Sequence, residues 1–226
     1  MMNPVLLRIL QLLILVLIQA LLLFGCAWNP GWIEGWLYIG LYFLCLLLAS
    51  ILMLPRHKEV IAERSRGTKG GKTWDILLTR LIAIPSLGIL MVAGLDQHFN
   101  WKPDFGLGIL FVGIIFFLLG YFIVIWAMNK NRFFSSVVRI QKERRHSTIT
   151  DGPYHYLRHP GYFGMIITAL GSAFLLRSVW ALIPFGIYAI LVIVRTALED
   201  KALQAELPGD KKYQRLTRYR LLPGIW

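Results

Sequence analysis

The polar residues best suited to chemistry lie between Gln141 and Tyr162, in the stretch QKERRHSTITDGPYHYLRHPGY. This stretch contains three of the five histidines and lies between long apolar runs. A second charged group, Arg195-Thr-Ala-Leu-Glu199-Asp200, follows further along the chain. On a helix, Arg195 and Glu199 would face the same way because they are four residues apart. An exposed pair of this kind contributes only about 0.3 to 0.5 kcal/mol, whereas ionisable groups at membrane depth usually serve a function.

Glycine and proline residues predict where this stretch turns and where the next helix begins. Gly152-Pro153 marks a turn, and Pro160 disfavours helical geometry at His159. Proline suits the first position of a helix, so we expect a helix to begin at Pro160, with free N–H groups near Arg158 and Gly161. Such a helix start attracts anions. In a simpler interpretation, Arg158 and His159 only cap a membrane span at the interface.

The histidines and cysteines do not have the spacing of a metal site. His155 and His159 are four residues apart, which suits zinc only if both lie on one helix. The flanking Gly-Pro and His-Pro steps argue against that helix, and no third ligand is near. Cys26 and Cys45 both fall inside apolar segments and form no metal-binding or disulfide pattern. We therefore expect no metal.

The chain that must position these residues has the composition of an all-α, polytopic membrane protein. Of its 226 residues, 57% are hydrophobic and only 16% are charged, which is outside the range of an ordinary soluble domain. Four spans are expected at residues 5–27, 32–54, 74–95 and 105–128. Apolar runs at 161–176 and 179–194 predict a C-terminal helical hairpin, which gives five to six transmembrane helices.

The basic residues predict how the chain crosses the membrane. Six Lys or Arg lie in 55–73 and seven each in 129–160 and 195–226, whereas the loops between them hold one at most. By the positive-inside rule, both termini and these segments are cytoplasmic. The net charge of +12 then reflects contact with anionic lipids rather than with nucleic acid, since no basic groove with interleaved aromatic residues is present. The glycines in the 56–73 loop predict a mobile segment rather than a phosphate-binding loop.

Two regions follow from this organisation. Residues 1–128 are expected to form an N-terminal scaffold of transmembrane helices, and residues 129–226 contain the polar stretch, the hairpin and a cytosolic tail. The tail breaks at Leu207-Pro208-Gly209 and restarts as a short basic helix over 211–220, with Tyr213 and Leu216 on its apolar side.

Taken together, these residues resemble the isoprenylcysteine carboxyl methyltransferase family and its prokaryotic relatives. The match covers roughly the last 90 residues, and an ordered set of matching parts is far more specific than one short motif. The first four spans match only as generic hydrophobic helices. In chain order, the matching parts are His146-Ser-Thr-Ile-Thr150, GPYHYLRHPGYFG, Arg195-x3-Glu199-Asp200 and the segment from Tyr213 to Pro223.

The resemblance implies an integral membrane methyltransferase that uses S-adenosylmethionine, bound at the cytoplasmic face beneath the C-terminal tail. Residues 129–226 would then be the catalytic region that holds the cofactor pocket. Arg195 would meet the substrate and, with Glu199, form the catalytic pair. The implied acceptor is lipophilic, such as the carboxylate of a prenylcysteine. Compact size and short loops suggest a prokaryotic inner membrane, with both termini in the cytoplasm. The implied cofactor contacts are Gln141, His146, Ser147, Thr148, Ile149, Tyr154, His159, Pro160, Gly161, Tyr162 and Glu199.

Three other functions compete with this interpretation. An NADPH-dependent sterol or enone reductase has a similar fold and an Arg-His-Pro signature, but typically carries asparagine and glutamate where this chain has Gly161 and Met165. A phospholipid amine methyltransferase would gain from Arg195 only through the phosphate of its substrate. A non-catalytic lipid-binding protein would have no need of the set His159, Tyr162, Arg195 and Glu199.

Overall fold

The computed structural model describes residues 3–54, 58–103 and 105–226, and within these ranges all regular structure is helical. Five helices, α1, α2, α4, α5 and α7, are long and apolar enough to cross a membrane, and α6 is a shorter apolar helix. The predicted all-α membrane bundle is therefore confirmed. The helices are α1 (Pro4–Ala27), α2 (Ile33–Met53), α3 (Lys58–Ser65), α4 (Thr73–Phe99), α5 (Leu107–Lys130), α6 (Pro160–Leu175), α7 (Leu182–Glu206) and α8 (Asp210–Leu216), with short 3-10 turns η1 (Lys142–Arg144) and η2 (Gly152–His155).

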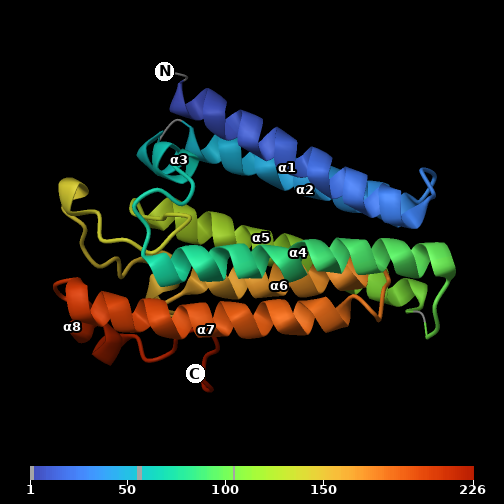
Figure 1. The fold of residues 1–226 in the computed structure, drawn as a ribbon. Coiled ribbons are helices and arrows are strands. Elements are labelled where there is room, and N and C mark those ends of the chain that lie inside the picture. The colour runs from blue at the N-terminus through green and yellow to red at the C-terminus, as the bar shows by residue number, and fades with distance from the viewer. Residues whose placement is uncertain (1–2, 55–57, 104) are drawn as a thin grey trace.

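The long helices alternate in direction along the chain (Figure 1). The start of α1, helix α3, the segment 131–159 and helix α8 gather at one end of the bundle, and residues 28–32, 100–103 and 176–181 lie at the other (Figure 1). The segments richest in Lys and Arg therefore share one end, which we call the basic end.

Helix α6 is held against α5 by close backbone contact at glycines. A Cβ atom added at Gly120 would lie 2.4 Å from Oγ1 and 2.5 Å from N of Thr168, and one added at Gly171 would lie 2.4 Å from N of Phe117. Small residues allow membrane helices to approach this closely. The start of α6, which carries Pro160 and Tyr162, is thereby fixed relative to α5.

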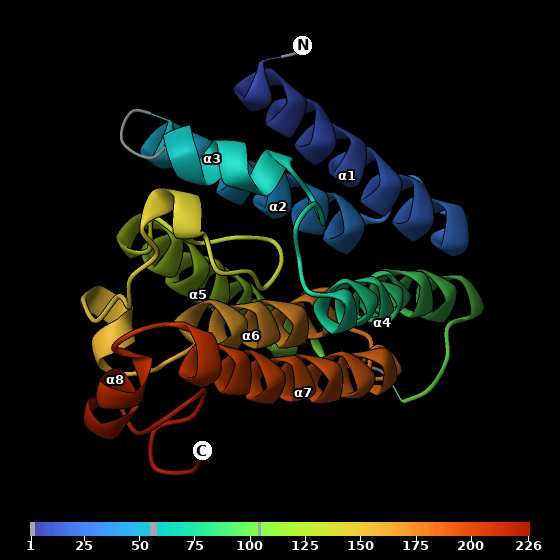
Figure 2. The same ribbon diagram turned by 60° about the vertical axis from the view of Figure 1, so that its left-hand side comes forward.

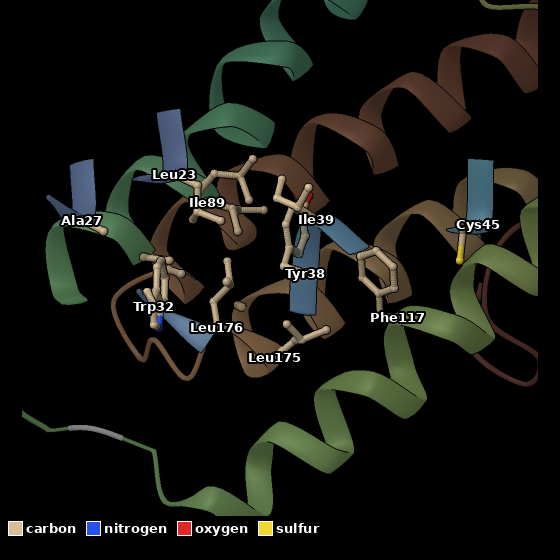
Figure 3. Close-up of a cluster of buried hydrophobic side chains, with 14 residues drawn as sticks. Leu23, Ala27, Trp32, Tyr38, Ile39, Cys45, Ile89, Phe117, Leu175 and Leu176 are labelled. Carbon is tan, nitrogen blue, oxygen red and sulfur yellow. The ribbon is translucent and has the colours of Figure 1, made fainter. Parts of the chain in front are cut away.

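A buried hydrophobic cluster joins the first helices to the rest of the bundle. It includes Leu23 of α1, Tyr38 of α2, Ile89 of α4, Phe117 of α5 and Leu175 of α6 (Figure 3). The rings of Tyr38 and Phe117 meet edge to face, with centroids 5.6 Å apart. The N-terminal scaffold and the C-terminal region thus share one core.

Helix α7 is longer than the sequence predicts. The second arm of the hairpin was expected to end at residue 194, but α7 continues to Glu206. No glycine or proline interrupts residues 195–206, and the helix stops only at Leu207-Pro208-Gly209, where Gly209 has φ 89°. Arg195 and Glu199 consequently lie inside a continuous helix rather than just beyond a hairpin.

Two polar segments also differ from prediction. The 56–73 segment, predicted to be a loop with a mobile core at 67–71, contains the short helix α3, whose Val60 and Ile61 are buried in a cluster with Met53. The tail helix α8 ends at Leu216 rather than at residue 220. Of the two residues predicted on the apolar side of this helix, Tyr213 is buried and Leu216 is 74% exposed.

Candidate active site

A cavity of about 350 Å³ lies at the basic end, walled by α4, α6, α7, the tail and the segment 131–159. It brings together residues separated by more than a hundred positions in the chain. Their predicted roles in cofactor or substrate binding stay predictions, but their convergence on one cavity is a property of the fold. The predicted site residues that line it are His146, Ser147, Thr148, Ile149, Tyr154, His159, Gly161, Tyr162, Arg195 and Glu199.

Two predicted cofactor contacts, Gln141 and Pro160, are not among the residues that line the cavity. The amide of Gln141 is fully buried; its Nε2 donates to the carbonyl of Phe133 at 2.7 Å and its Oε1 accepts from Arg144 at 2.6 Å. Pro160 is buried at the first position of α6, where a missing N–H costs nothing. Gln141 therefore stabilises the conformation of the 131–159 segment, and Pro160 determines where α6 begins.

Arg195 and Glu199 face the same cavity, but they do not form the predicted pair with each other. The Arg195 guanidinium donates to both carboxylate oxygens of Asp75, from Nε at 2.7 Å and from Nη2 at 3.1 Å. Glu199 instead accepts from the hydroxyl of Tyr162 at 2.5 Å. The guanidinium carbon also lies 5.2 Å from the centroid of the Tyr162 ring, within range of a cation–π contact.

Asp75 is the residue that sequence reasoning missed. It is fully buried in the first turn of α4, and its Oδ2 also accepts the N–H of Val138 at 2.7 Å. Asp75 thus ties the loop that carries part of the cavity wall to both α4 and α7. The available signal was an aspartate at the start of an apolar run, because carboxylates at membrane depth are usually paired and functional.

His146 lies in the segment 131–159, lines the cavity and is kept neutral by its surroundings. Its Nδ1 accepts the backbone N–H of Gln141 at 3.3 Å, and its ring packs on Phe133 with centroids 4.3 Å apart. Burial, reinforced by the charges of Arg139 and Arg144, lowers the pKa of His146 to about 4. With Nδ1 accepting, the proton of the neutral ring resides on Nε2, which is left as a donor.

The C-terminal tail is tied to the start of α6 through Asp200. This buried carboxylate accepts from Arg158 at 2.9 Å and from Arg220 at 2.8 Å, and it lies 3.0 Å from Nε2 of His159. The N–H groups of Arg158 and His159 also donate to the carbonyls of Tyr219 and Arg220. Figure 2 shows the tail beside this helix start.

Tyr213 of α8 fastens the tail at a second point. Its hydroxyl donates to the carbonyl of Tyr154 at 2.7 Å, and Tyr213 lines the cavity. Burial raises the pKa of both tyrosines, so both hydroxyls stay protonated. The tail is therefore part of the cavity wall.

Three buried polar atoms around the cavity lack a hydrogen-bond partner among the described residues. They are Oγ1 of Thr79, Oγ1 of Thr148 and Nε of Arg158, and all three residues line the cavity. Buried polar groups are normally satisfied, so these atoms mark places for a polar ligand. Over the same residues, no three His, Cys, Asp or Glu side chains are grouped as metal ligands.

A second cavity, of about 450 Å³, adjoins the first and is walled by α1, α2, α4, α5 and α6 together with residues near their ends. Most of its lining is apolar, as expected between membrane-spanning helices. The two cavities share six lining residues: Arg64, Ala83, Ser86, Phe134, Met165 and Tyr188.

Comparison with known proteins identifies the family of this chain. Residues 113–205 match the Isoprenylcysteine carboxyl methyltransferase (ICMT) family. The chain is 32% identical over 149 residues to Protein-S-isoprenylcysteine O-methyltransferase B of Arabidopsis thaliana, a match that covers 62% of this chain and 72% of the relative. A probable protein-S-isoprenylcysteine O-methyltransferase of Oryza sativa subsp. japonica is 33% identical over 143 residues, with 62% and 74% covered. The chain belongs to the ICMT family.

As a member of the ICMT family, the protein is a membrane methyltransferase. The family match runs from α5 through the loop and α6 into α7, so it includes Tyr162, Arg195 and Glu199. Asp75 and the tail residue Tyr213 lie outside it. The relatives named here are plant proteins, so they lend no support to the predicted prokaryotic origin.

Proposed function

We propose that this ICMT-family protein transfers a methyl group from S-adenosylmethionine to the carboxylate of a prenylcysteine-like lipid at the cytoplasmic face of a membrane. The observation that carries the proposal is the pair of adjoining cavities. One is polar and lies at the basic end, and the other is apolar and lies between membrane-spanning helices. Two reactants of opposite polarity can thus meet where the cavities share residues.

The residues of the polar cavity fit S-adenosylmethionine. Glu199 and the faces of Tyr154 and Tyr162 suit its sulfonium cation, and the unpartnered Nε of the Arg158 guanidinium suits its carboxylate. The unpartnered hydroxyl of Thr148 offers a donor or acceptor to its polar parts. When bound, S-adenosylmethionine supplies a methyl group that bonds to an acceptor oxygen as the methyl carbon–sulfur bond breaks.

The protein's own residues then need to align the reactants and exclude water. The acceptor carboxylate becomes a neutral ester without giving or taking a proton, so no general acid is required. Alignment can supply about 7 to 11 kcal/mol at best, provided the geometry is rigid. The Asp75–Arg195 pair and the tail bonds, from Arg220 to Asp200 and from Tyr213 to Tyr154, support this rigidity.

Arg195 keeps one donor for the acceptor. Its Nε and Nη2 are committed to Asp75 and to the carbonyl of Ser136, whereas its Nη1 has no hydrogen-bond partner within the described ranges. We therefore assign Nη1 to an oxygen of the acceptor, with Glu199 on the cofactor side. Because Asp75 neutralises the guanidinium, Arg195 acts here through a directed hydrogen bond more than through net charge.

The proposal is tested with the full chain in detergent. Calorimetric titration should show binding of S-adenosylmethionine and none of NADPH, and labelled methyl should reach N-acetyl-S-farnesylcysteine. Glu199→Gln should weaken S-adenosylmethionine binding about 10- to 100-fold, because a hydrogen bond to a charged group is lost. Glu206→Gln is the matched control, since Glu206 lies on the same helix and pairs with Lys72 outside the cavity.

Two results would refute the proposal. Binding of NADPH alone would identify a reductase, and methyl transfer only to a phospholipid amine would identify a different acceptor. An unchanged affinity in Glu199→Gln would remove the role assigned to that carboxylate.

A further inference from the structure

The second, mostly apolar cavity, which we call the membrane cavity, carries two positive charges. Arg8 of α1 and Arg64 of α3 both line it, and no Asp or Glu is among its described lining residues. Tyr42 and Tyr121 add hydroxyl groups to the same wall. A space otherwise walled by apolar side chains therefore has a cationic part, which suits a ligand with a long apolar chain and one anionic group.

Arg64 lies where the two cavities meet, since it lines both. Its guanidinium carbon is 5.4 Å from the centroid of the Phe134 ring. Across the described ranges, no hydrogen bond or ion pair joins Arg64 to another residue. Its neighbours differ in this respect, because Arg66 pairs with Glu63 and Arg144 pairs with Glu59.

The position of Arg64 is set by the way α3 is fastened. The carbonyl of Ser65 accepts from Nε2 of Gln11 in α1 at 3.2 Å, and Glu63 accepts from Nε and Nη2 of Arg139 at 2.6 and 2.7 Å. Burial, with the nearby charge of Arg8, lowers the pKa of Arg64 to about 10, so it is still protonated at neutral pH. A fixed, charged and unpaired guanidinium faces the cavities.

We infer that Arg64, assisted by Arg8, binds the carboxylate of the acceptor while its apolar chain fills the membrane cavity. This inference rests on the proposed function and names the residues that select the acceptor. A guanidinium binds a carboxylate through paired N–H groups and holds it in a fixed direction. Bound at Arg64, the carboxylate is at the boundary with the polar cavity, where Arg195 supplies its free Nη1.

The same charges argue against an amine acceptor, since a protonated amine would be repelled by two uncompensated cations. The phosphate of a phospholipid shares the anionic chemistry of a carboxylate and is the other source of a ligand. The cavity favours the carboxylate because a single chain fits one apolar space of about 450 Å³.

Equilibrium binding to the purified full chain tests the inference without relying on turnover. The probes are N-acetyl-S-farnesylcysteine, its neutral carboxamide and phosphatidylglycerol. We expect the wild-type chain to prefer the carboxylate over the carboxamide by about tenfold or more, and Arg64→Gln to abolish most of that preference. Arg64→Lys keeps the charge and should restore part of it, and Arg8→Gln should have a smaller effect.

Lys58→Gln is the control, because it removes a positive charge from the same helix without touching either cavity. Equal binding of carboxylate and carboxamide by the wild-type chain, an unchanged preference in Arg64→Gln, or preferential binding of phosphatidylglycerol would each overturn the inference. Failure of the proposed function gives a different pattern, because the chain would then not bind S-adenosylmethionine, whatever its preference between the two farnesyl probes.

Discussion

Asp75 lies at the centre of the polar contacts in the site. It neutralises Arg195, accepts the Val138 N–H, and is fully buried. Removing one member of a buried ion pair leaves the other charge uncompensated, which costs more than the pair itself contributes. The stability of the site therefore depends on Asp75, although Asp75 does not line the cavity.

The first prediction concerns this pair. Asp75→Asn should lower the free energy of unfolding by about 3 to 5 kcal/mol, because Arg195 remains buried without its counter-charge. The double variant Asp75→Asn/Arg195→Met should recover part of that loss, since no unpaired charge is left. Denaturant unfolding in detergent measures both, and equal stability of Asp75→Asn and wild type would contradict the pairing.

The second prediction concerns His146 and pH. Its pKa is about 4 in the folded chain, against about 6.5 when unfolded. Between these values the unfolded chain binds more protons, so the stabilising contribution of neutral His146 is present above pH 6.5 and is lost as pH falls towards 4. The melting temperature should fall more between pH 7.5 and pH 5 in wild type than in His146→Gln. Identical falls would show that His146 does not titrate in this way.

The site residues themselves could be found from sequence, but their partners could not. His159, Tyr162 and Glu199 stand out because polar residues are rare beside apolar runs. Their contacts depend on packing: Arg195 and Glu199 share a helix face, yet each finds a better partner on another helix, Asp75 on α4 and Tyr162 on α6. Spacing predicts which side chains share a face, and tertiary structure decides what they bind.

Among the elements, the hydrophobic helices were predicted well and the polar ones poorly. Long apolar runs mark the membrane spans, and Pro160 marks the start of α6. Helix α3 was missed because half of its eight residues are charged, although Val60 and Ile61 are buried. Few apolar residues suffice when a short helix is fastened by hydrogen bonds and ion pairs to its neighbours, as α3 is through Ser65 and Glu63.

The third prediction concerns the contact between α5 and α6. Gly120→Ala should destabilise the protein by about 1 to 3 kcal/mol, because its Cβ would overlap Thr168 and force the helices apart. Since α6 carries Tyr162, binding of S-adenosylmethionine should weaken as well. Gly108→Ala is the control, because a Cβ at Gly108 on the same helix meets nothing within 4 Å. Equal effects of the two substitutions would show that the close contact is not needed.

In the whole molecule, the basic segments and the polar cavity lie at the same end of the helix bundle. The start of α1, helix α3, the segment 131–159 and the tail share the basic end (Figure 1). The polar cavity is lined by residues of three of these, namely α3, 131–159 and the tail. The positive-inside rule predicts that this end faces the cytoplasm. The tail can then fold over the cavity without crossing the membrane.

The fourth prediction tests this orientation. A fluorescent protein fused after Trp226 should fluoresce, and alkaline phosphatase fused at the same place in a bacterial host should be inactive, because each reporter works on only one side of the membrane. A fusion after residue 101, at the opposite end of the bundle, should give the opposite results. Active phosphatase at the C-terminus would place the basic end outside the cell.

The meeting of two cavities at Arg64 also affects how the rate depends on each reactant. One cavity is walled mainly by membrane helices and the other by segments at their ends. The lipid acceptor is therefore counted as a mole fraction of the bilayer or micelle, and the methyl donor as a concentration in water. Inert detergent added at constant total acceptor should dilute the acceptor and slow the reaction, while leaving the half-saturating concentration of the methyl donor unchanged.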